Sequence, residues 1–257
     1  KLHNAAYRAC GLDEAFVFVA NHVIPEQLPQ AIQGARAMGF RGITCTIPHK
    51  SSVIPLLDSL GPAAQQLRAV NTVVQQEGAL HGTNTDWYGI FEPLRRRNLP
   101  KDSTVAILGA GGTARAAAYA VQQAQGTPLF FNRTLARAQQ LAQEFKGEAH
   151  PLETLSTHLP QCQALIQTTS VGMQAPSASL VPQTALHPDL IVLDAIYTPF
   201  TTKLLQDAQH AGASIIRGAE MFLFQALKQF EAYTQHPAPT HAMEQVLCAH
   251  FGMQQII

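Results

Sequence analysis

Short apolar runs alternate with amphipathic stretches through the second half of the chain, and this pattern limits the folds available to it. The runs are too short for helices and are bounded by Gly, Pro or polar residues, so each is expected to be a strand. They are residues 105–108, 129–131, 164–166, 191–193 and 214–216. Helices are expected between them at residues 113–125, 135–145 and 202–211. Because parallel strands need such crossover helices, the segment is predicted to form a buried, doubly wound parallel sheet.

The first half of the chain also mixes strands and helices. Strands are expected at residues 15–19 and 42–46, a helix at 26–38, and a hairpin from 72–76 and 79–82 around the turn pair Glu77-Gly78. A polar segment, Arg95 to Asp102, then separates the halves and indicates a domain boundary. The three consecutive arginines at its start suit the C-terminal end of a helix better than a binding patch.

Composition excludes several classes of protein. Lys plus Arg (17) balances Asp plus Glu (17), and the charged fraction of 13% leaves no basic field for a nucleic acid. No apolar run approaches the ~20 residues of a membrane span. The four cysteines stand far apart without metal-ligand spacing, so reduced thiols, no metal site and a cytoplasmic location are expected. Lys1 leads straight into a helix-like stretch with no cap, so residues are expected to precede it.

A glycine-rich turn follows the strand at 105–108 and opens a helix of small residues. Such a turn lets backbone N–H groups and the positive end of the helix approach a pyrophosphate. The motif alone is weak, and a tight turn between a strand and a helix would explain it about as well. Its candidate cofactor residues are Gly109, Ala110, Gly111, Gly112, Thr113 and Ala114.

The next strand ends where a ribose-recognition residue belongs, about 20 residues after the turn. The Asp or Glu that would bind a ribose 2′-hydroxyl is absent, and Asn132, Arg133 and Thr134 stand there, with Arg137 one helical turn later. Two guanidinium groups and a hydroxyl suit a 2′-phosphate, so the sequence indicates NADP rather than NAD. The alternative is a pair of surface arginines at the start of a solvated helix.

Lys50 and Asp86 each follow a predicted strand of the first half. A Lys and a carboxylate brought together could handle a proton at an alcohol or ketone while a nicotinamide exchanges hydride. Spacing does not show that they meet, and a surface Lys with a helix-capping Asp is an alternative.

A series of motifs resembles the shikimate dehydrogenase family, in family order over nearly the whole chain. Each motif is weak alone, but the ordered series is highly specific. The motifs are Leu2-His3-Asn4, residues 46–50 (TIPHK), 69–72 (AVNT), 82–86 (GTNTD), 109–116 (GAGGTARA), 132–134 (NRT), 169–173 (TSVGM), 194–199 (DAIYTP), and 218–221 (GAEM) through Gln225.

The resemblance implies a small-molecule enzyme that reduces 3-dehydroshikimate with NADPH. Its fold would be α/β, with a substrate domain (1–100 plus 220–257), a Rossmann-type, doubly wound dinucleotide domain (101–219) and a cleft between them. It would be a monomer or homodimer. Lys50 would pass the proton at the substrate oxygen, and Asp86 would orient or charge Lys50. The implied substrate ligands are Thr46, Asn71 and Gln225 for the ring hydroxyls and Tyr197 for the carboxylate, and further cofactor residues are Thr169, Gly218 and Met221.

The chain departs from the family pattern in four places. A Ser-x-Ser segment that grips the substrate carboxylate does not precede His3-Asn4 in this sequence. Thr44 replaces a usual Asn, Arg68 a common Gly, and Gln167 another Asn. These departures leave open a relative acting on quinate or another cyclic hydroxy acid. A non-catalytic sensor that binds the same ligands is a further alternative, and the presence of Lys50 and Asp86 counts against it.

Overall fold

A computed structural model describes all 257 residues of the chain. Contacts divide it into two compact units, one of Lys1–Asp86 with Gln225–Ile257 and the other of Trp87–Phe224. The sequence-based boundaries near residues 100 and 219 stay a prediction. No helix is both long and apolar enough to span a membrane. The predicted α/β class is confirmed, since helices accompany a sheet in each unit.

The first unit contains a mixed four-stranded sheet in the order β1-β3-β4-β2. The predicted hairpin is present, with β3 and β4 antiparallel and Gly82 opposite Val73. β1 pairs antiparallel with β3, and the two-residue β2 pairs parallel with β4. The strands are β1 (Gly42–Thr44), β2 (Ser59–Leu60), β3 (Thr72–Gln76) and β4 (Ala79–Thr83).

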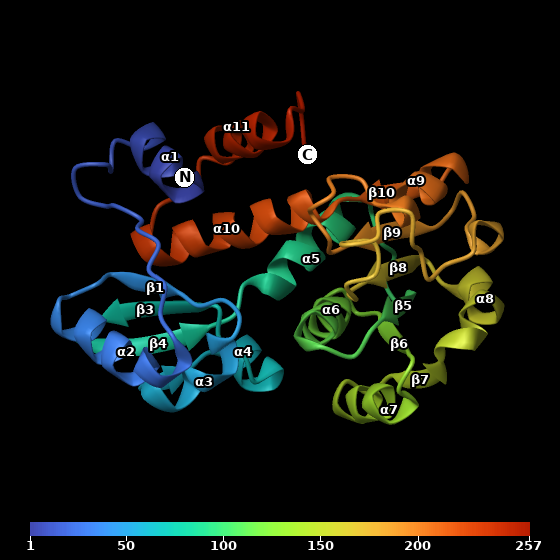
Figure 1. The fold of residues 1–257 in the computed structure, drawn as a ribbon, viewed down its shortest axis with the longest axis horizontal. Coiled ribbons are helices and arrows are strands. Elements are labelled where there is room, and N and C mark those ends of the chain that lie inside the picture. Colours follow the sequence, from blue (N-terminus) through green and yellow to red (C-terminus); the bar gives the residue numbers. More distant parts are fainter. The chain divides into compact units, whose positions relative to one another are not determined.

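Helices lie on both faces of this sheet (Figure 1). Leu28 and Ile32 of α2 share a core with Val73 and Leu80 of the hairpin. On the other face, the C-terminal half of α10 packs on the sheet, and Phe230 of α10 also contacts Tyr7 of α1. The helices are α1 (Leu2–Ala9), α2 (Leu28–Ala37), α3 (His49–Ser52), α4 (Pro62–Leu67), α10 (Gly218–Thr234) and α11 (Thr240–Phe251), with 3-10 turns η1 (Pro25–Gln27) and η2 (Ile54–Leu56).

The strand expected at residues 15–19 is wrong. Residues 16–24 are irregular, and no strand pairs with them. The Asn4 side chain instead accepts from the Phe18 N–H (2.6 Å) and donates to the Phe18 carbonyl (2.9 Å). The amide thus satisfies the backbone groups that a neighbouring strand would have bonded, and Val17 and Val19 stay exposed.

The second unit contains a six-stranded parallel sheet in the order β10-β9-β8-β5-β6-β7. All five strands predicted for this half are confirmed, and β7 is an edge strand that the periodicity did not reveal. The strands are β5 (Thr104–Leu108), β6 (Thr127–Asn132), β7 (Glu148–Pro151), β8 (Ala164–Gln167), β9 (Ile191–Asp194) and β10 (Ser214–Ile216).

Helices cover both faces of the parallel sheet, as the crossover rule requires (Figure 1). One face packs Ala106 and Leu108 of β5 against Leu155 of α8 and Leu204 of α9. The alternate residues of β5, Val105 and Ile107, are fully buried on the other face, where α6 and α7 lie. The elements are α5 (Asp86–Arg96), α6 (Gly112–Gln123), α7 (Leu135–Glu144), α8 (Leu155–His158), α9 (Lys203–His210), η3 (Leu152–Thr154), η4 (Leu159–Gln161) and η5 (Gln183–Ala185).

The order of the sheet reverses between β5 and β8. From β5 the chain moves outward to β6 and β7, then returns to β8 and continues through β9 to β10 on the opposite side. In open α/β sheets, ligands bind at the carboxyl ends of the strands at such a switch point. The glycine turn at residues 109–112 therefore follows the strand where a nucleotide is expected.

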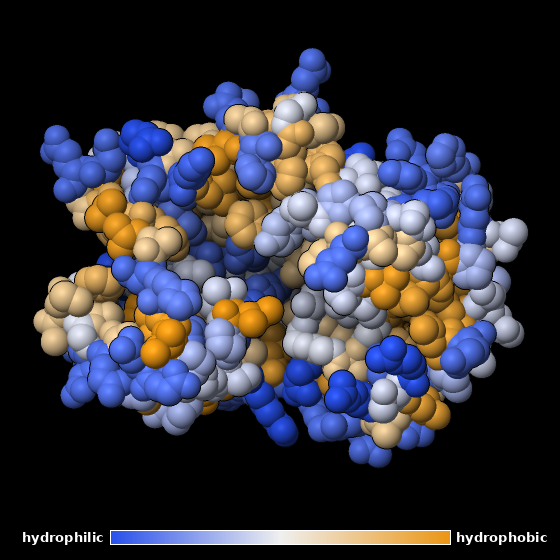
Figure 2. Space-filling model, viewed as in Figure 1, coloured by the Kyte–Doolittle hydropathy of each residue, from blue (hydrophilic) through white to orange (hydrophobic).

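The exposed surface mixes hydrophilic and hydrophobic residues, and Figure 2 shows the hydrophobic ones in several separate patches on the face it draws. The large apolar side chains that are most exposed come from separate stretches of the chain. Val17 (74%), Met38 (69%) and Ile47 (85%) are examples from the first unit.

Arg68 ends α4 in a left-handed conformation, with φ 51° and ψ 38°. A side chain with a Cβ is disfavoured there, which explains why glycine suits this position. We expect Arg68→Gly to stabilise the first unit by roughly 0.5 to 1 kcal/mol, because relief of backbone strain exceeds the extra entropy of the unfolded chain. Urea unfolding at pH 7 would measure the change. Arg68→Ala, which keeps a Cβ, should show no gain, and equal gains in both variants would contradict the strain argument.

Asp194, the last residue of β9, is completely buried. It accepts hydrogen bonds from the Thr202 hydroxyl (2.6 Å) and the Ile196 N–H (3.0 Å). Burial raises the pKa of its carboxyl from 3.8 to about 6, although both hydrogen bonds oppose the shift. The unfolded chain therefore ionises before the folded one as pH rises.

We expect Asp194 to make the second unit less stable as pH rises from about 4 to about 6, by ~3 kcal/mol at most. The contribution of Asp194 to the free energy of unfolding is complete below the pKa of its carboxyl in the unfolded chain. It is lost as pH rises through the higher pKa of the folded protein. Asp194→Asn should remove this part of the pH dependence, which unfolding curves between pH 4 and 7 would reveal. His3 is a control with the opposite sign, because burial lowers its pKa to about 4. The folded protein therefore loses stability through His3 as pH falls, and His3→Gln should remove that loss. Parallel wild-type and Asp194→Asn curves would contradict the assignment.

Candidate active site

The structure brings Lys50 and Asp86 together, although 36 residues separate them in sequence. Lys50 lies in the short helix α3, where its backbone carbonyl accepts from the Val70 N–H at 2.7 Å. Asp86 is the first residue of α5, and its N–H is bonded to the Asn84 side chain. Lys50 Nζ donates to Asp86 Oδ2 at 2.7 Å. The alternative of an isolated surface Lys and a capping Asp is therefore wrong.

The pair is partly buried, with 30% of the Lys50 side chain and 18% of the Asp86 side chain exposed. Ion pairs with this much solvent access stabilise a fold by only about 0 to 1 kcal/mol. The geometry matters more, since the carboxylate fixes the ammonium while Nζ keeps two further protons for other acceptors. A positioned ammonium with solvent access suits proton exchange with a bound oxygen.

Asn71 holds the other oxygen of Asp86. Its Nδ2 donates to Asp86 Oδ1 at 2.8 Å and to the Thr85 hydroxyl at 3.0 Å. Its Oδ1 accepts from the Thr85 N–H at 2.8 Å and from the Thr72 hydroxyl at 2.7 Å. Asn71 is buried, with only 2% of its surface exposed, and its amide hydrogen-bonding groups all have partners. The amide therefore locks the carboxylate in place.

The remaining predicted substrate residues fall in both units. Thr46 is exposed just beyond β1, and Gln225 is the first residue of α10 that belongs to the first unit. Tyr197 belongs to the second unit, where it is 50% exposed and its ring lies 5.7 Å from that of Phe222. The neighbouring His49 bonds the Val23 carbonyl through Nε2 at 2.7 Å, so it secures a loop.

The glycine turn of the second unit has the form that a pyrophosphate needs. Gly109 has φ +110°, and a Cβ there would lie 2.7 Å from the Thr168 hydroxyl, so only glycine fits. Gly111 caps α6 without a side-chain hydrogen bond, and a Cβ on Gly111 or Gly112 would meet nothing within 4 Å. The start of α6 thus has open space beside Gly111 and Gly112, which fits a dinucleotide phosphate.

The loop after β8 closes against this turn. The Thr168 hydroxyl donates to the Leu108 carbonyl at 2.6 Å, and a Cβ on Gly109 would lie 3.1 Å from Thr169. Gln167 is buried, accepts from the Thr169 N–H at 3.0 Å and donates to the Val171 carbonyl at 3.3 Å. The structure therefore brings Thr169 and Gly109 together and assigns Gln167 the shaping of the loop.

The predicted 2′-phosphate residues lie between β6 and α7. Asn132 donates to the Thr134 carbonyl at 2.9 Å, and Thr134 is the residue before α7. Arg133 and Arg137 are exposed and form no ion pair within the chain. Two uncommitted guanidinium groups at a helix start fit a phosphate monoester.

The three consecutive arginines at residues 95–97 differ from Arg133 and Arg137, because each of the three pairs with a carboxylate of the chain. Arg95 and Arg96 bond Glu92, and Arg97 bonds the completely buried Glu220 at 2.7 Å. Their interpretation as a helix end is confirmed, since α5 ends at Arg96.

Gly218 begins α10 in close contact with the loop after β9. A Cβ at Gly218 would lie 2.4 Å from the Ile196 carbonyl oxygen, so a larger residue would push the helix away. Met221 is half-buried one turn later. The helix thus connects the predicted cofactor residues Gly218 and Met221 with Gln225.

Sequence reasoning assigned no role to two buried polar residues of this region, Thr72, which ends the motif at residues 69–72, and Gln229. Gln229 Nε2 donates to the Thr72 hydroxyl at 3.1 Å, next to Asn71. Gln229 reads as one more polar residue of an amphipathic helix. Only the packing of α10 on β3 identifies it.

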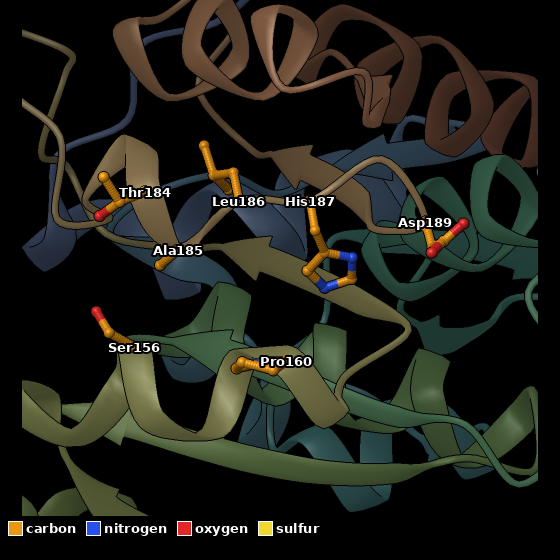
Figure 3. A pocket seen from close by; sticks show the side chains of 7 residues that line it. All are labelled: Ser156, Pro160, Thr184, Ala185, Leu186, His187 and Asp189. Carbon is orange, nitrogen blue, oxygen red and sulfur yellow. The ribbon is translucent and has the colours of Figure 1, made fainter.

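A pocket of about 370 Å³ lies elsewhere in the second unit, between the η4 and η5 turns (Figure 3). None of the predicted site residues lines it. His187 is prominent among its side chains (Figure 3), and its Nε2 is buried and lacks a partner. The pocket is lined by Ser156, Pro160, Thr184, Ala185, Leu186, His187 and Asp189.

Three family models match the chain. Residues 1–73 match the shikimate dehydrogenase substrate-binding domain, residues 94–185 the shikimate/quinate 5-dehydrogenase model, and residues 218–248 the shikimate 5′-dehydrogenase C-terminal domain.

Individual relatives match along nearly the full chain. A shikimate dehydrogenase (NADP⁺) of Natronomonas pharaonis is 40% identical over 247 residues, which cover 96% of this chain and 92% of the relative. Among solved structures, shikimate 5-dehydrogenase of Listeria monocytogenes with shikimate and NAD has a TM-score of 0.89 and 32% identity, covering 96% and 90% of the two chains. The Thermus thermophilus enzyme with NADP(H) and shikimate has a TM-score of 0.86 and 34% identity, covering 95% and 91%. The chain therefore belongs to the shikimate dehydrogenase family.

Proposed function

We propose that this protein interconverts shikimate and 3-dehydroshikimate with NADP(H), in the synthesis of aromatic amino acids. The observation that carries the proposal is the Lys50–Asp86 ion pair at 2.7 Å, held by Asn71. It occurs in a chain 40% identical to an NADP-dependent shikimate dehydrogenase. We expect a monomer or homodimer in the cytoplasm, with no nucleic-acid or membrane partner.

Lys50 and Asp86 would handle the proton of the reaction. When NADP(H) is bound, it exchanges a hydride with the ring carbon that carries the reacting oxygen. In reduction, Lys50 Nζ gives a proton to that oxygen as it becomes a hydroxyl, and in oxidation Nζ takes the proton back. Asp86 aims Nζ and balances the positive charge that Lys50 carries before it gives the proton.

The substrate would be held by short polar side chains. Thr46 and Gln225 would bond ring hydroxyls, and Asn71 would share the N–H that it directs at Asp86. Tyr197 would bond the carboxylate. Each of these groups discriminates against a ring that lacks its partner hydroxyl, because an unpaired polar group is costly once water is excluded.

The cofactor would be held by the second unit. The N–H groups at the start of α6 suit its pyrophosphate, Thr169 adjoins the glycine turn, and Arg133 and Arg137 suit its 2′-phosphate. Gly218 and Met221 would lie toward the nicotinamide.

A quinate dehydrogenase is the second candidate, since one matching family model covers both substrates. Kinetic comparison of shikimate and quinate with NADP⁺ and NAD⁺ separates the candidates. A higher kcat/KM for quinate or for NAD⁺ would overturn the choice. Binding of NADP⁺ and shikimate without any turnover would instead indicate a sensor.

We expect Lys50→Met to lower kcat/KM for shikimate about 100-fold or more, because the group that exchanges the proton is lost. Absorbance of NADPH formed from shikimate would measure the loss, and the KM for NADP⁺ should stay within about twofold. Lys228→Met is the matched control, since this lysine pairs with Glu231 on an exposed face. Activity of Lys50→Met close to that of the control would contradict the role.

We expect Arg133→Ala to raise the KM for NADP⁺ about tenfold or more, because a charge-assisted hydrogen bond to phosphate contributes about 1.5 to 3 kcal/mol. The KM for NAD⁺, which lacks the 2′-phosphate, should change little, and Arg137→Ala should act in the same direction. Arg8→Ala removes an exposed charge from α1 and serves as the control. An equal effect on both cofactors would contradict recognition of the 2′-phosphate.

A further inference from the structure

Two buried polar side chains lie behind Asn71, on the side away from Asp86. Thr72 of β3 is completely buried and Gln229 of α10 is 2% exposed. Gln229 Nε2 donates to Thr72 Oγ1 at 3.1 Å and lies 3.5 Å from the Asn71 carbonyl oxygen. Most of the other buried residues of this stretch of α10 are apolar, such as Ala226 and Phe230. A buried amide among them is costly unless it has a partner.

The donor and acceptor groups of Gln229, Thr72 and Asn71 assign a direction to the hydrogen bonds between them. An amide N–H can only donate, so the Thr72 hydroxyl must accept from Gln229. The single hydroxyl proton of Thr72 is then free for Asn71 Oδ1, which lies 2.7 Å away. Gln229 thus occupies one lone pair of the Thr72 oxygen, while Thr72 donates its proton to Asn71 Oδ1, which can only accept.

The same logic fixes the orientation of the Asn71 amide. Oδ1 faces two donors, the Thr72 hydroxyl and the Thr85 N–H, so Nδ2 must face Asp86. If the amide turned over, Nδ2 would meet the Thr85 N–H, which can only donate, and Oδ1 would meet the Asp86 carboxylate, which can only accept. Each mismatch leaves a buried group unsatisfied, so the amide keeps one orientation.

We propose that Gln229, acting through Thr72, is a positioning residue for the proton-transfer pair, because it holds the Asn71 amide that aims Asp86 at Lys50. No hydrogen bond joins Gln229 to Asp86 or Lys50. It reaches Asp86 through the bonds Gln229–Thr72–Asn71–Asp86, and its Nε2 also lies 3.5 Å from the Asn71 carbonyl oxygen. The group beyond Gln229 in this hydrogen-bond network is His3, which bonds Gln229. His3 is electrically neutral because burial lowers its pKa to about 4. The readout by turnover rests on the proposed function.

The test compares Thr72→Val, Thr72→Ser and Gln229→Met with Thr234→Val in the full-length protein. Valine keeps the shape of threonine without its hydroxyl, and serine keeps the hydroxyl. Thr234 is the matched control, because it is a buried threonine on α10, the helix of Gln229. Its hydroxyl donates to the Phe230 carbonyl at 2.8 Å and has no hydrogen-bonded path to Asp86. Thermal unfolding of all four variants identifies any that fail to fold.

We expect Thr72→Val and Gln229→Met to lower kcat/KM for shikimate about tenfold, with the KM for NADP⁺ unchanged. Thr72→Ser should retain activity within about threefold of wild type, and Thr234→Val should match wild type. The proposal is overturned if Thr72→Ser loses as much as Thr72→Val, or if the two disruptive variants lose no more than Thr234→Val. If Thr72→Val does not fold, Gln229→Met decides the outcome by the same comparison with Thr234→Val.

A second readout needs no substrate and separates failure of this inference from failure of the proposed function. The side-chain NH₂ protons of Asn71 should exchange slowly with water in wild type, since both are bonded within a buried network. In protein with ¹⁵N-labelled asparagine, Thr72→Val and Gln229→Met should accelerate this exchange at least tenfold and Thr234→Val should not. Wild-type protein without shikimate turnover would sink the proposed function alone, whereas unchanged exchange in both variants would sink the positioning role.

Discussion

The Asn71 side chain is the contact on which the rest of the candidate site depends. Its oxygen accepts hydrogen bonds from Thr72 of β3 and from Thr85 before α5, and its nitrogen donates to Asp86. A carboxylate alone can rotate, and a half-exposed lysine has many rotamers. One buried amide removes much of that freedom because its two ends are chemically different. The order of the site therefore comes from buried neutral groups rather than from the ion pair itself.

The second unit solves a different problem by a different means. A dinucleotide phosphate has to reach backbone N–H groups, so the chain must leave space rather than fill it. Gly109 bends where a Cβ would strike Thr168, and Gly111 and Gly112 present no side chain to the incoming group. The loop after β8 is then held by Gln167, whose buried amide bonds two backbone groups of that loop. Fixed backbone around an open space is what anion binding at a helix end requires.

The sequence predicted the features that depend on local pattern and missed those that depend on packing. Alternation was sufficient for the parallel sheet, whereas the position of the nucleotide site at the glycine turn stays a prediction. The strand at residues 15–19 failed because the Asn4 amide replaces a strand neighbour there, which periodicity does not reveal. Lys50 and Asp86 were paired only by family resemblance, since their contact needs the path from β1 to α5. The proposed role of Gln229 could not be predicted from the sequence, because its hydrogen bond with Thr72 forms only when α10 packs on β3.

The three substitutions from the family pattern are absorbed inside the units that carry them. The Thr44 hydroxyl bonds that of the buried Tyr233 at 2.8 Å, Gln167 bonds its own loop, and Arg68 accepts a left-handed backbone in an exposed position. None of the three bonds Lys50, Asn71 or Asp86, whose mutual contacts are intact. Each of the three positions contacts groups of its own unit and not the proposed proton-transfer pair. The substitutions therefore give no ground for preferring another cyclic acid over shikimate.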